Sequence, residues 1–136
     1  MKGFYERPLT SGDHAVPFEG GRVTELVARP LINLLFPELR SVHQPLAGEW
    51  AVRRELFETL SVPSGYAVEL AALIDTMRRH GPAGLAQVDL GTRAHRHQSL
   101  NDLTGMAEQI IGMALTRAGH LTGAGDPERP AVNGVA

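Results

Sequence analysis

The sequence predicts an α/β fold that is rich in helix and contains two or three short strands. Residues 2–7 have the pattern of a short strand that Pro8 stops, and the apolar run 85–90 is of strand length and partly β-branched. Between and after these runs, apolar residues recur at helical spacing. The elements are ordered like the second half of an α/β domain. So few strands leave their edges unpaired, and the set of elements therefore looks incomplete.

Four helices are predicted. Thr24 is a good N-cap for the first, Pro30 should kink it because proline lacks a backbone donor, and Pro37 ends it. The clearest helix covers residues 66–80, where a broad apolar stripe stops at Gly81 and the proline after it. The other two helices are predicted at residues 51–60 and 99–118.

The remaining segments are predicted to be connections. Residues 9–20 contain two glycines, a proline and mixed charge without an apolar period, which is typical of a loop. Residues 119–136 are rich in Gly, Pro and Ala, which is typical of a disordered tail. We therefore expect one ordered part over residues 1–118 and a tail over residues 119–136.

Composition excludes several function classes. A chain of 136 residues is at most one domain, and a formal net charge of −2 argues against general binding to nucleic acid or anionic membranes. The absence of cysteine excludes disulfides, thiolate chemistry and cysteine zinc sites. No segment reaches about 18 apolar residues, and the N-terminus lacks the pattern of a signal peptide. Cytoplasmic residence is the expectation that follows.

A cationic loop follows the second predicted strand. Gly91 and Thr92 end the apolar run, and Arg93 and His95 come next. Ligands of α/β enzymes bind beyond the carboxyl ends of strands, and residues two apart in an extended segment point to one side. One of the two could therefore bind a metal while the other meets an anion; the alternative is a solvated basic loop. His95 would need carboxylate partners, and Asp89 points elsewhere, so no complete metal site is visible.

A second candidate site lies where the first helix is predicted to begin. Gly21, Arg22 and Thr24 place a flexible backbone, a guanidinium and a hydroxyl beside a helix N-terminus. The exposed N–H groups and the helix dipole there favour a phosphate or carboxylate, and an arginine can bind it with two donors. The alternative is that Thr24 is only a cap and Arg22 only a surface charge.

A third candidate site lies at the start of the 66–80 helix. Tyr66 and Glu69 are three residues apart, so both could line one pocket in which the carboxylate accepts bonds from sugar hydroxyls. The alternative is a partly solvated carboxylate that the helix dipole favours.

Four stretches of the chain together carry a family resemblance. They are residues 21–31 (GRVTELVARPL), 44–50 (QPLAGEW), 65–70 (GYAVEL) and 86–91 (AQVDLG), the last followed by His95 and Arg96. In this order and spacing, over residues 2–115, they resemble glucosyl-3-phosphoglycerate synthase, a family of retaining GT-A glycosyltransferases of actinobacteria and some other bacteria. The fold that the resemblance implies is the C-terminal half of a GT-A domain, which carries the acceptor and metal sites.

The resemblance implies transfer of glucose from UDP-glucose to the 2-hydroxyl of 3-phosphoglycerate, the first step toward glucosylglycerate and methylglucose lipopolysaccharides. It also implies Mg²⁺ or Mn²⁺ as cofactor and a homodimer as the full-length protein, without a nucleic-acid or membrane partner. Carried over by residue, Gly21, Arg22 and Thr24 match the acceptor phosphate and carboxylate site. Leu46 matches a loop position whose backbone approaches the sugar, and Tyr66 and Glu69 match positions beside the glucose. Arg93 matches a position that contacts the diphosphate, and His95 matches a metal ligand.

The sequence departs from the family pattern in one respect. The family has uridine-binding loops and an Asp-x-Asp metal motif in an N-terminal half, and neither occurs in these 136 residues. We therefore expect a fragment that transfers no glucose by itself. Two alternatives stay open: a related GT-A transferase, such as a mannosyl-3-phosphoglycerate or mannosylglycerate synthase, and a non-catalytic dimerisation remnant.

Overall fold

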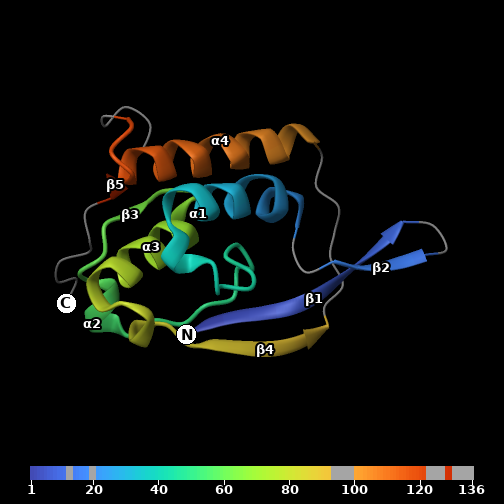
Figure 1. Ribbon diagram of the computed structural model, residues 1–136, viewed down its shortest axis with the longest axis horizontal. Coiled ribbons are helices and arrows are strands. Elements are labelled where there is room, and N and C mark those ends of the chain that lie inside the picture. The colour runs from blue at the N-terminus through green and yellow to red at the C-terminus, as the bar shows by residue number, and fades with distance from the viewer. Residues whose placement is uncertain (12–13, 19–20, 93–99, 122–127, 130–136) are drawn as a thin grey trace.

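The computed structural model describes residues 1–11, 14–18, 21–92, 100–121 and 128–129. Within them the chain has an α/β architecture in which a layer of helices packs beside a small twisted sheet (Figure 1). The α/β prediction is therefore confirmed. No helix among these residues has the length and apolar character needed to cross a membrane.

The sheet is built on the first strand. β1 (Lys2–Ser11) lies between β2 (His14–Phe18), with which it is antiparallel, and β4 (Gln87–Thr92), with which it is parallel. At its beginning β1 also contacts the chain near Trp50, because the N–H of Gly3 donates to the carbonyl of Glu49 over 2.8 Å. The N-terminal end of β1 is thus flanked on both sides by backbone.

Two predictions about this region are wrong. β1 continues past Pro8 to Ser11, and part of the predicted loop 9–20 forms β2. Pro8 faces Pro17 across the antiparallel pair. Hydrogen-bonded and non-bonded pairs alternate along such a ladder, and two facing prolines fit a non-bonded position, where neither strand needs an N–H donor.

Most of the helices lie together on one side of the sheet (Figure 1). Two short strands, β3 (Val62–Pro63) and β5 (Glu128–Arg129), form a separate antiparallel pair. The rest of the predicted tail lies mostly outside the described residues, so the division at residue 118 stays a prediction. The helical elements are η1 (Thr24–Ala28), α1 (Arg29–Leu35), η2 (Pro37–Leu39), α2 (Arg54–Phe57), α3 (Val68–His80), η3 (Pro82–Gly84) and α4 (Leu100–Arg117).

The first helix begins at Arg22, so the prediction that Thr24 is its N-cap is wrong. Thr24 lies inside the helix at the start of a π-helical turn, and its carbonyl accepts the N–H of Arg29, five residues on. This wider turn immediately precedes Pro30, which cannot donate to the carbonyl of Leu26 and would crowd it in a regular α-helix. The proline therefore marks an irregular helix, and α1 ends before Pro37 as predicted.

Of the three later helices, α3 and α4 follow the sequence pattern closely and α2 does not. α3 begins at Val68, two residues after the predicted start, and ends at His80. Gly81 follows it with a φ of 65°, which suits glycine, and its N–H donates to the carbonyl of Met77 over 2.8 Å. α4 covers the predicted last helix. The predicted helix 51–60 is reduced to the single turn of α2.

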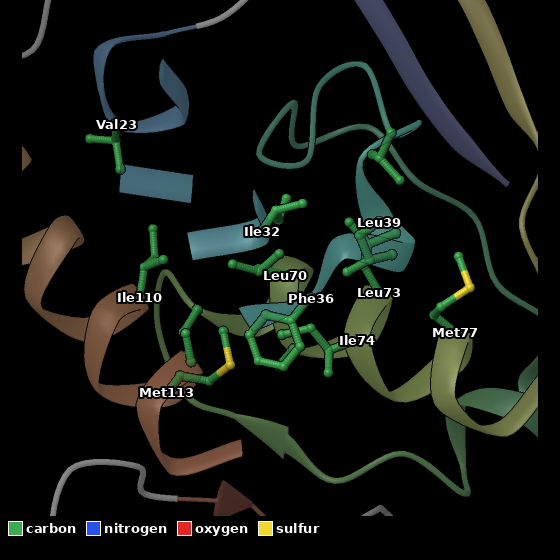
Figure 2. Packing of buried hydrophobic residues seen from close by; sticks show 14 residues of the cluster. Val23, Ile32, Phe36, Leu39, Leu70, Leu73, Ile74, Met77, Ile110 and Met113 are labelled. Atoms are coloured by element: carbon green, nitrogen blue, oxygen red, sulfur yellow. The ribbon is translucent and has the colours of Figure 1, made fainter. Parts of the chain in front are cut away.

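The core lies between α1, α3 and α4 (Figure 2). Helix α3 contributes a buried stripe, as its apolar period predicts, and α1 and α4 close over it. In contrast, all six residues of β4 are exposed, including Val88 and Leu90. The cluster comprises Val23, Ile32, Phe36, Leu39, Val42, Ala67, Leu70, Ala71, Leu73, Ile74, Met77, Ile110, Met113 and Ala114.

Candidate functional site

The loop that contains Leu46 is fixed to β1 by hydrogen bonds. The side-chain amide of Gln44 accepts the N–H of Tyr5 over 3.0 Å and donates to the carbonyl of the same residue. The hydroxyl of Tyr5 donates to the carbonyl of Ala47 over 3.1 Å. Gln44, Tyr5 and Ala47 are all buried, so these bonds form away from water. The loop is therefore held in one conformation around Leu46, which packs against the core.

The same loop is bound from the helical side by Glu69. This side chain, in the first turn of α3, accepts the N–H of Gly48 at Oε2 over 3.0 Å. Its Oε1 lies 2.5 Å from the ammonium nitrogen of Lys2, and both side chains are buried. The expected alternative of a partly solvated carboxylate is thus wrong. A buried carboxylate needs a charge partner, and Lys2 supplies it.

Tyr66 lies in the turn just before α3. Its side chain is 53% exposed, so its hydroxyl and ring are accessible to a ligand. Its backbone N–H donates to the side-chain carbonyl of Gln109 in α4 over 2.9 Å. Gly65 precedes it with a φ of 88°, a conformation that favours glycine. Tyr66 is therefore positioned by α4 as well as by α3.

The predicted anion site lies at the start of the first helix. The carbonyl of Gly21 accepts the N–H of Glu25 over 3.0 Å, Arg22 is exposed, and Val23 is anchored in the core beside Ala67 and Ile110. Thr24 is buried, with 4% of its surface exposed. The backbone of this helix start is thus firmly placed, while the Thr24 side chain faces the interior.

The two cationic residues of the predicted metal-bearing loop lie outside the described residues. β4 ends at Thr92, so Arg93 and His95 follow the carboxyl end of a strand, as the sequence predicts. Among the residues that the structure describes, no group of three or more His, Asp or Glu side chains could hold a metal ion. The described part of the chain therefore supplies no complete metal site.

A cavity of about 850 Å³ opens beside the Lys2–Glu69 pair. Apolar side chains of α2, of α3 and of the segments around Trp50 and Leu85 form most of its wall, and its charged lining residues are Lys2, Arg53 and Glu69. Trp50 packs near Phe57, with ring centroids 6.4 Å apart. The buried ion pair is therefore bordered by an apolar hollow rather than by a packed core.

The structure brings some predicted site residues together and leaves others apart. Glu69 accepts a hydrogen bond from Gly48, which lies two residues after Leu46 in the same loop. Tyr66 lies three residues before Glu69, in the turn that leads into α3. Sequence reasoning missed Lys2, Gln44 and Gln109, which hold these residues in place. Their partners are distant along the chain, so no local pattern pointed to them.

The sequences of known proteins show what this arrangement is related to. The chain is 50% identical over 119 residues to glucosyl-3-phosphoglycerate synthase of Mycolicibacterium smegmatis, covering 88% of this chain and 39% of that protein. It is 52% identical over 124 residues to the synthase of Mycobacterium tuberculosis, covering 88% and 38%. It is 48% identical over 117 residues to the synthase of Petrotoga mobilis, covering 86% and 36%. No protein-family model matches the chain.

Solved structures agree with the sequences. A crystal structure of the Mycobacterium tuberculosis synthase with Mn²⁺, UDP and glucosyl-3-phosphoglycerate is 48% identical and superposes with a TM-score of 0.74, covering 87% of this chain and 38% of that one. A second, with Mn²⁺, UDP-glucose and phosphoglyceric acid, is 49% identical with a TM-score of 0.75 and the same coverage. The chain spans about two fifths of the length of the relatives it matches. By sequence and by fold, the chain matches a segment of glucosyl-3-phosphoglycerate synthases, which are GT-A glycosyltransferases.

Proposed function

We propose that the chain forms part of a retaining glucosyltransferase that transfers glucose from UDP-glucose to the 2-hydroxyl of 3-phosphoglycerate. The observation that carries this proposal is the identity of about one residue in two to synthases of that activity, together with superposition on a synthase that binds UDP, Mn²⁺ and the glucosylated product. The proposal applies to the whole transferase, of which this chain supplies a segment.

The geometry supports a role on the glucose side. The Gln44–Gly48 loop is bound to β1 by Gln44 and Tyr5 and to α3 by Glu69. A sugar must be oriented before its anomeric carbon can be attacked, and a fixed backbone supplies this orientation without an entropic cost at the moment of reaction. In the proposal, the backbone at Leu46 and the side chains of Tyr66 and Glu69 border the glucose.

The start of the first helix supports a role on the acceptor side. Gly21 is half-buried just before the helix, and Arg22 is exposed on the first helical turn. N–H groups at a helix start attract anions, and a guanidinium can bind a carboxylate or phosphate with two parallel bonds. Because Thr24 is buried, its proposed contribution is restricted to placing the backbone of the helix start.

The metal and nucleotide contacts are proposed on fewer observations. Arg93 is proposed to contact the diphosphate and His95 to ligate Mg²⁺ or Mn²⁺, the ion present in the related structures being Mn²⁺. The described residues contain no cluster that would complete the ligand set, so further ligands must come from elsewhere in the transferase. Cytoplasmic residence and a homodimeric full-length protein belong to the same proposal.

A chimera tests the proposal directly. In it, this chain replaces the region that it matches in the Mycolicibacterium smegmatis synthase. We expect transfer of glucose from UDP-glucose to 3-phosphoglycerate, measured as release of UDP and formation of the glucosylated acid, and no such transfer by the 136-residue chain alone. A folded chimera that uses a mannose donor instead would favour the related mannosyltransferase. A folded chimera that transfers no sugar but self-associates would favour the non-catalytic remnant.

A further inference from the structure

Lys2 is a buried cation in a chain whose other basic residues are all arginines. Only 1% of its surface is exposed. Lysine is almost never buried so completely unless its charge is paired. Its ammonium nitrogen lies 2.5 Å from Oε1 of Glu69, and it donates to the carbonyls of Gly3 and Glu49 over 3.2 and 3.5 Å.

The ion pair holds three segments together. Lys2 belongs to β1 and Glu69 to α3, and both contact the end of the loop that carries Leu46. Glu69 accepts the N–H of Gly48, and Lys2 donates to the carbonyl of the next residue, Glu49. The two charged side chains thus bind the backbone of two successive loop residues, Gly48 and Glu49. Gly48 has a φ of 77°, so the loop turns sharply at the point where it is held.

The other bonds to this loop are of a different kind. Gln44 and Tyr5 hold it to β1 through neutral hydrogen bonds. Lys2 supplies the charge that faces Oε1 of Glu69, while Oε2 binds the loop. If the ammonium were removed, a buried carboxylate would lose its charge partner and would turn toward water, which releases the N–H of Gly48.

We propose that Lys2 is a positioning residue for the donor sugar: its ammonium fixes the carboxylate of Glu69 and, through it, the loop that carries Leu46. This inference rests on the proposed function, which places Glu69 and Leu46 beside the glucose. Lys2 touches neither substrate and acts only through Glu69. Removal of its charge therefore impairs use of UDP-glucose and leaves binding of the acceptor at the first helix unchanged.

The ion pair itself can be tested in the 136-residue chain, because Lys2 is its one lysine. Amine acetylation followed by mass spectrometry reports the reactivity of this side chain, separately from that of the α-amino group. We expect Lys2 to be acetylated at least tenfold faster in Glu69→Gln than in the unsubstituted chain. Glu58→Gln is the matched control, because Glu58 pairs with Arg54 at the surface, and should leave the rate unchanged. Equal rates in Glu69→Gln and the unsubstituted chain would overturn the inference.

The chimera tests the role in the reaction. For Lys2→Met we expect kcat/KM for UDP-glucose to fall by about 10- to 100-fold, the size of effect that misplacement of a reacting group produces. KM for 3-phosphoglycerate should stay the same. Since Lys2 acts through Glu69, Lys2→Met should have almost no further effect in a Glu69→Gln chimera. A rise in KM for 3-phosphoglycerate as large as the fall in kcat/KM for UDP-glucose would show that the lysine is merely structural. Full additivity of Lys2→Met and Glu69→Gln would show the same.

The two proposals fail in different ways. A folded, unsubstituted chimera without glucose transfer contradicts the proposed function, and the inference about Lys2 falls with it, whatever the acetylation rates show. An active chimera in which Lys2→Met leaves UDP-glucose kinetics unchanged contradicts only the inference about Lys2.

Discussion

The side-chain carbonyl of Gln109 accepts the backbone N–H of Tyr66 over 2.9 Å, which ties α4 to the turn that begins α3. The turn favours Gly65, because its φ is 88° and a β-carbon there would lie 2.4 Å from Oε1 of Gln109, which would have to move. Two elements far apart in the sequence thus meet at a glycine. This contact places the Tyr66 side chain, which the proposed function assigns to the donor sugar.

Gly65→Ala should therefore destabilise the chain. The substitution adds a side chain at a φ of 88° and forces Gln109 away, and we expect a loss of about 2 kcal/mol in the free energy of unfolding. Urea denaturation followed by circular dichroism measures it. Gly105→Ala is the control, because Gly105 lies inside α4 with open space around its β-carbon position. It should gain about 0.5–1 kcal/mol, since alanine favours helix over glycine. Losses of equal size at both positions would contradict the prediction.

Arg117 should be worth far more to stability than Arg54. Arg117 bonds both carboxylate oxygens of Asp75, over 3.1 and 3.2 Å, and also the carbonyl of Ser61, and its side chain is largely buried. Arg117→Met should cost about 3 kcal/mol, because it leaves a partly buried carboxylate without its partner. Arg54→Met removes an exposed pair with Glu58 and should cost less than about 0.5 kcal/mol. The comparison of urea midpoints decides, and a similar cost at both positions would refute it.

Gln44 and Gln87 offer a matched test of burial. Each side-chain amide donates to one backbone carbonyl and accepts from one backbone N–H, but Gln44 is buried and Gln87 is exposed. Gln44→Ala removes two buried hydrogen bonds to the backbone of Tyr5, so we expect a loss of about 2–3 kcal/mol. Gln87→Ala should cost less than about 1 kcal/mol, because water replaces the lost bonds. Thermal unfolding of both variants measures the difference. Equal shifts of Tm would contradict the prediction that the buried hydrogen bonds of Gln44 stabilise the loop more than the exposed ones of Gln87 do.

Arg22 should contribute to acceptor binding. Titration calorimetry of the 136-residue chain with 3-phosphoglycerate should give an affinity that falls about 10- to 100-fold in Arg22→Ala, which removes a charge-assisted bond. Raised salt should weaken binding by the unsubstituted chain. Arg40→Ala is the control, since Arg40 lies beyond the other end of α1 and bonds the carbonyl of Asn33. Glycerol 3-phosphate, which lacks the carboxylate, should bind more weakly. An affinity that Arg22→Ala leaves unchanged would remove this residue from the site.

Local patterns predicted much of the fold. The apolar stripe of α3 and its stop at Gly81 are confirmed, as is the position of α4, because both helices bury the face that their period defines. The local pattern gave a wrong prediction where strand pairing overrides it, in β1 and β2. Pro8 and Pro17 argued against strands, yet they face each other in an antiparallel pair whose ladder does not need their N–H groups at that point.

The candidate site was predicted in part. The residues Leu46, Tyr66 and Glu69 were singled out, and the structure binds the loop of Leu46 directly to Glu69. Thr24 was expected to cap the first helix, but the helix starts earlier, because Arg22 and Val23 already adopt helical geometry and Val23 is anchored in the core. Arg93 and His95 lie outside the described residues and stay predictions.

The fold class, the main helices and the strand before the cationic loop could be predicted from the sequence, and so could the family resemblance. Each of these depends on residues close together in the chain or on the order of short stretches. The interactions between distant residues follow only from the way in which the elements pack. Lys2 and Glu69 are far apart in the sequence, and nothing in their neighbourhoods specifies the pairing. It arises because β1 and α3 enclose the loop of Gly48 between them, where two opposite charges removed from water must be close together to be stable.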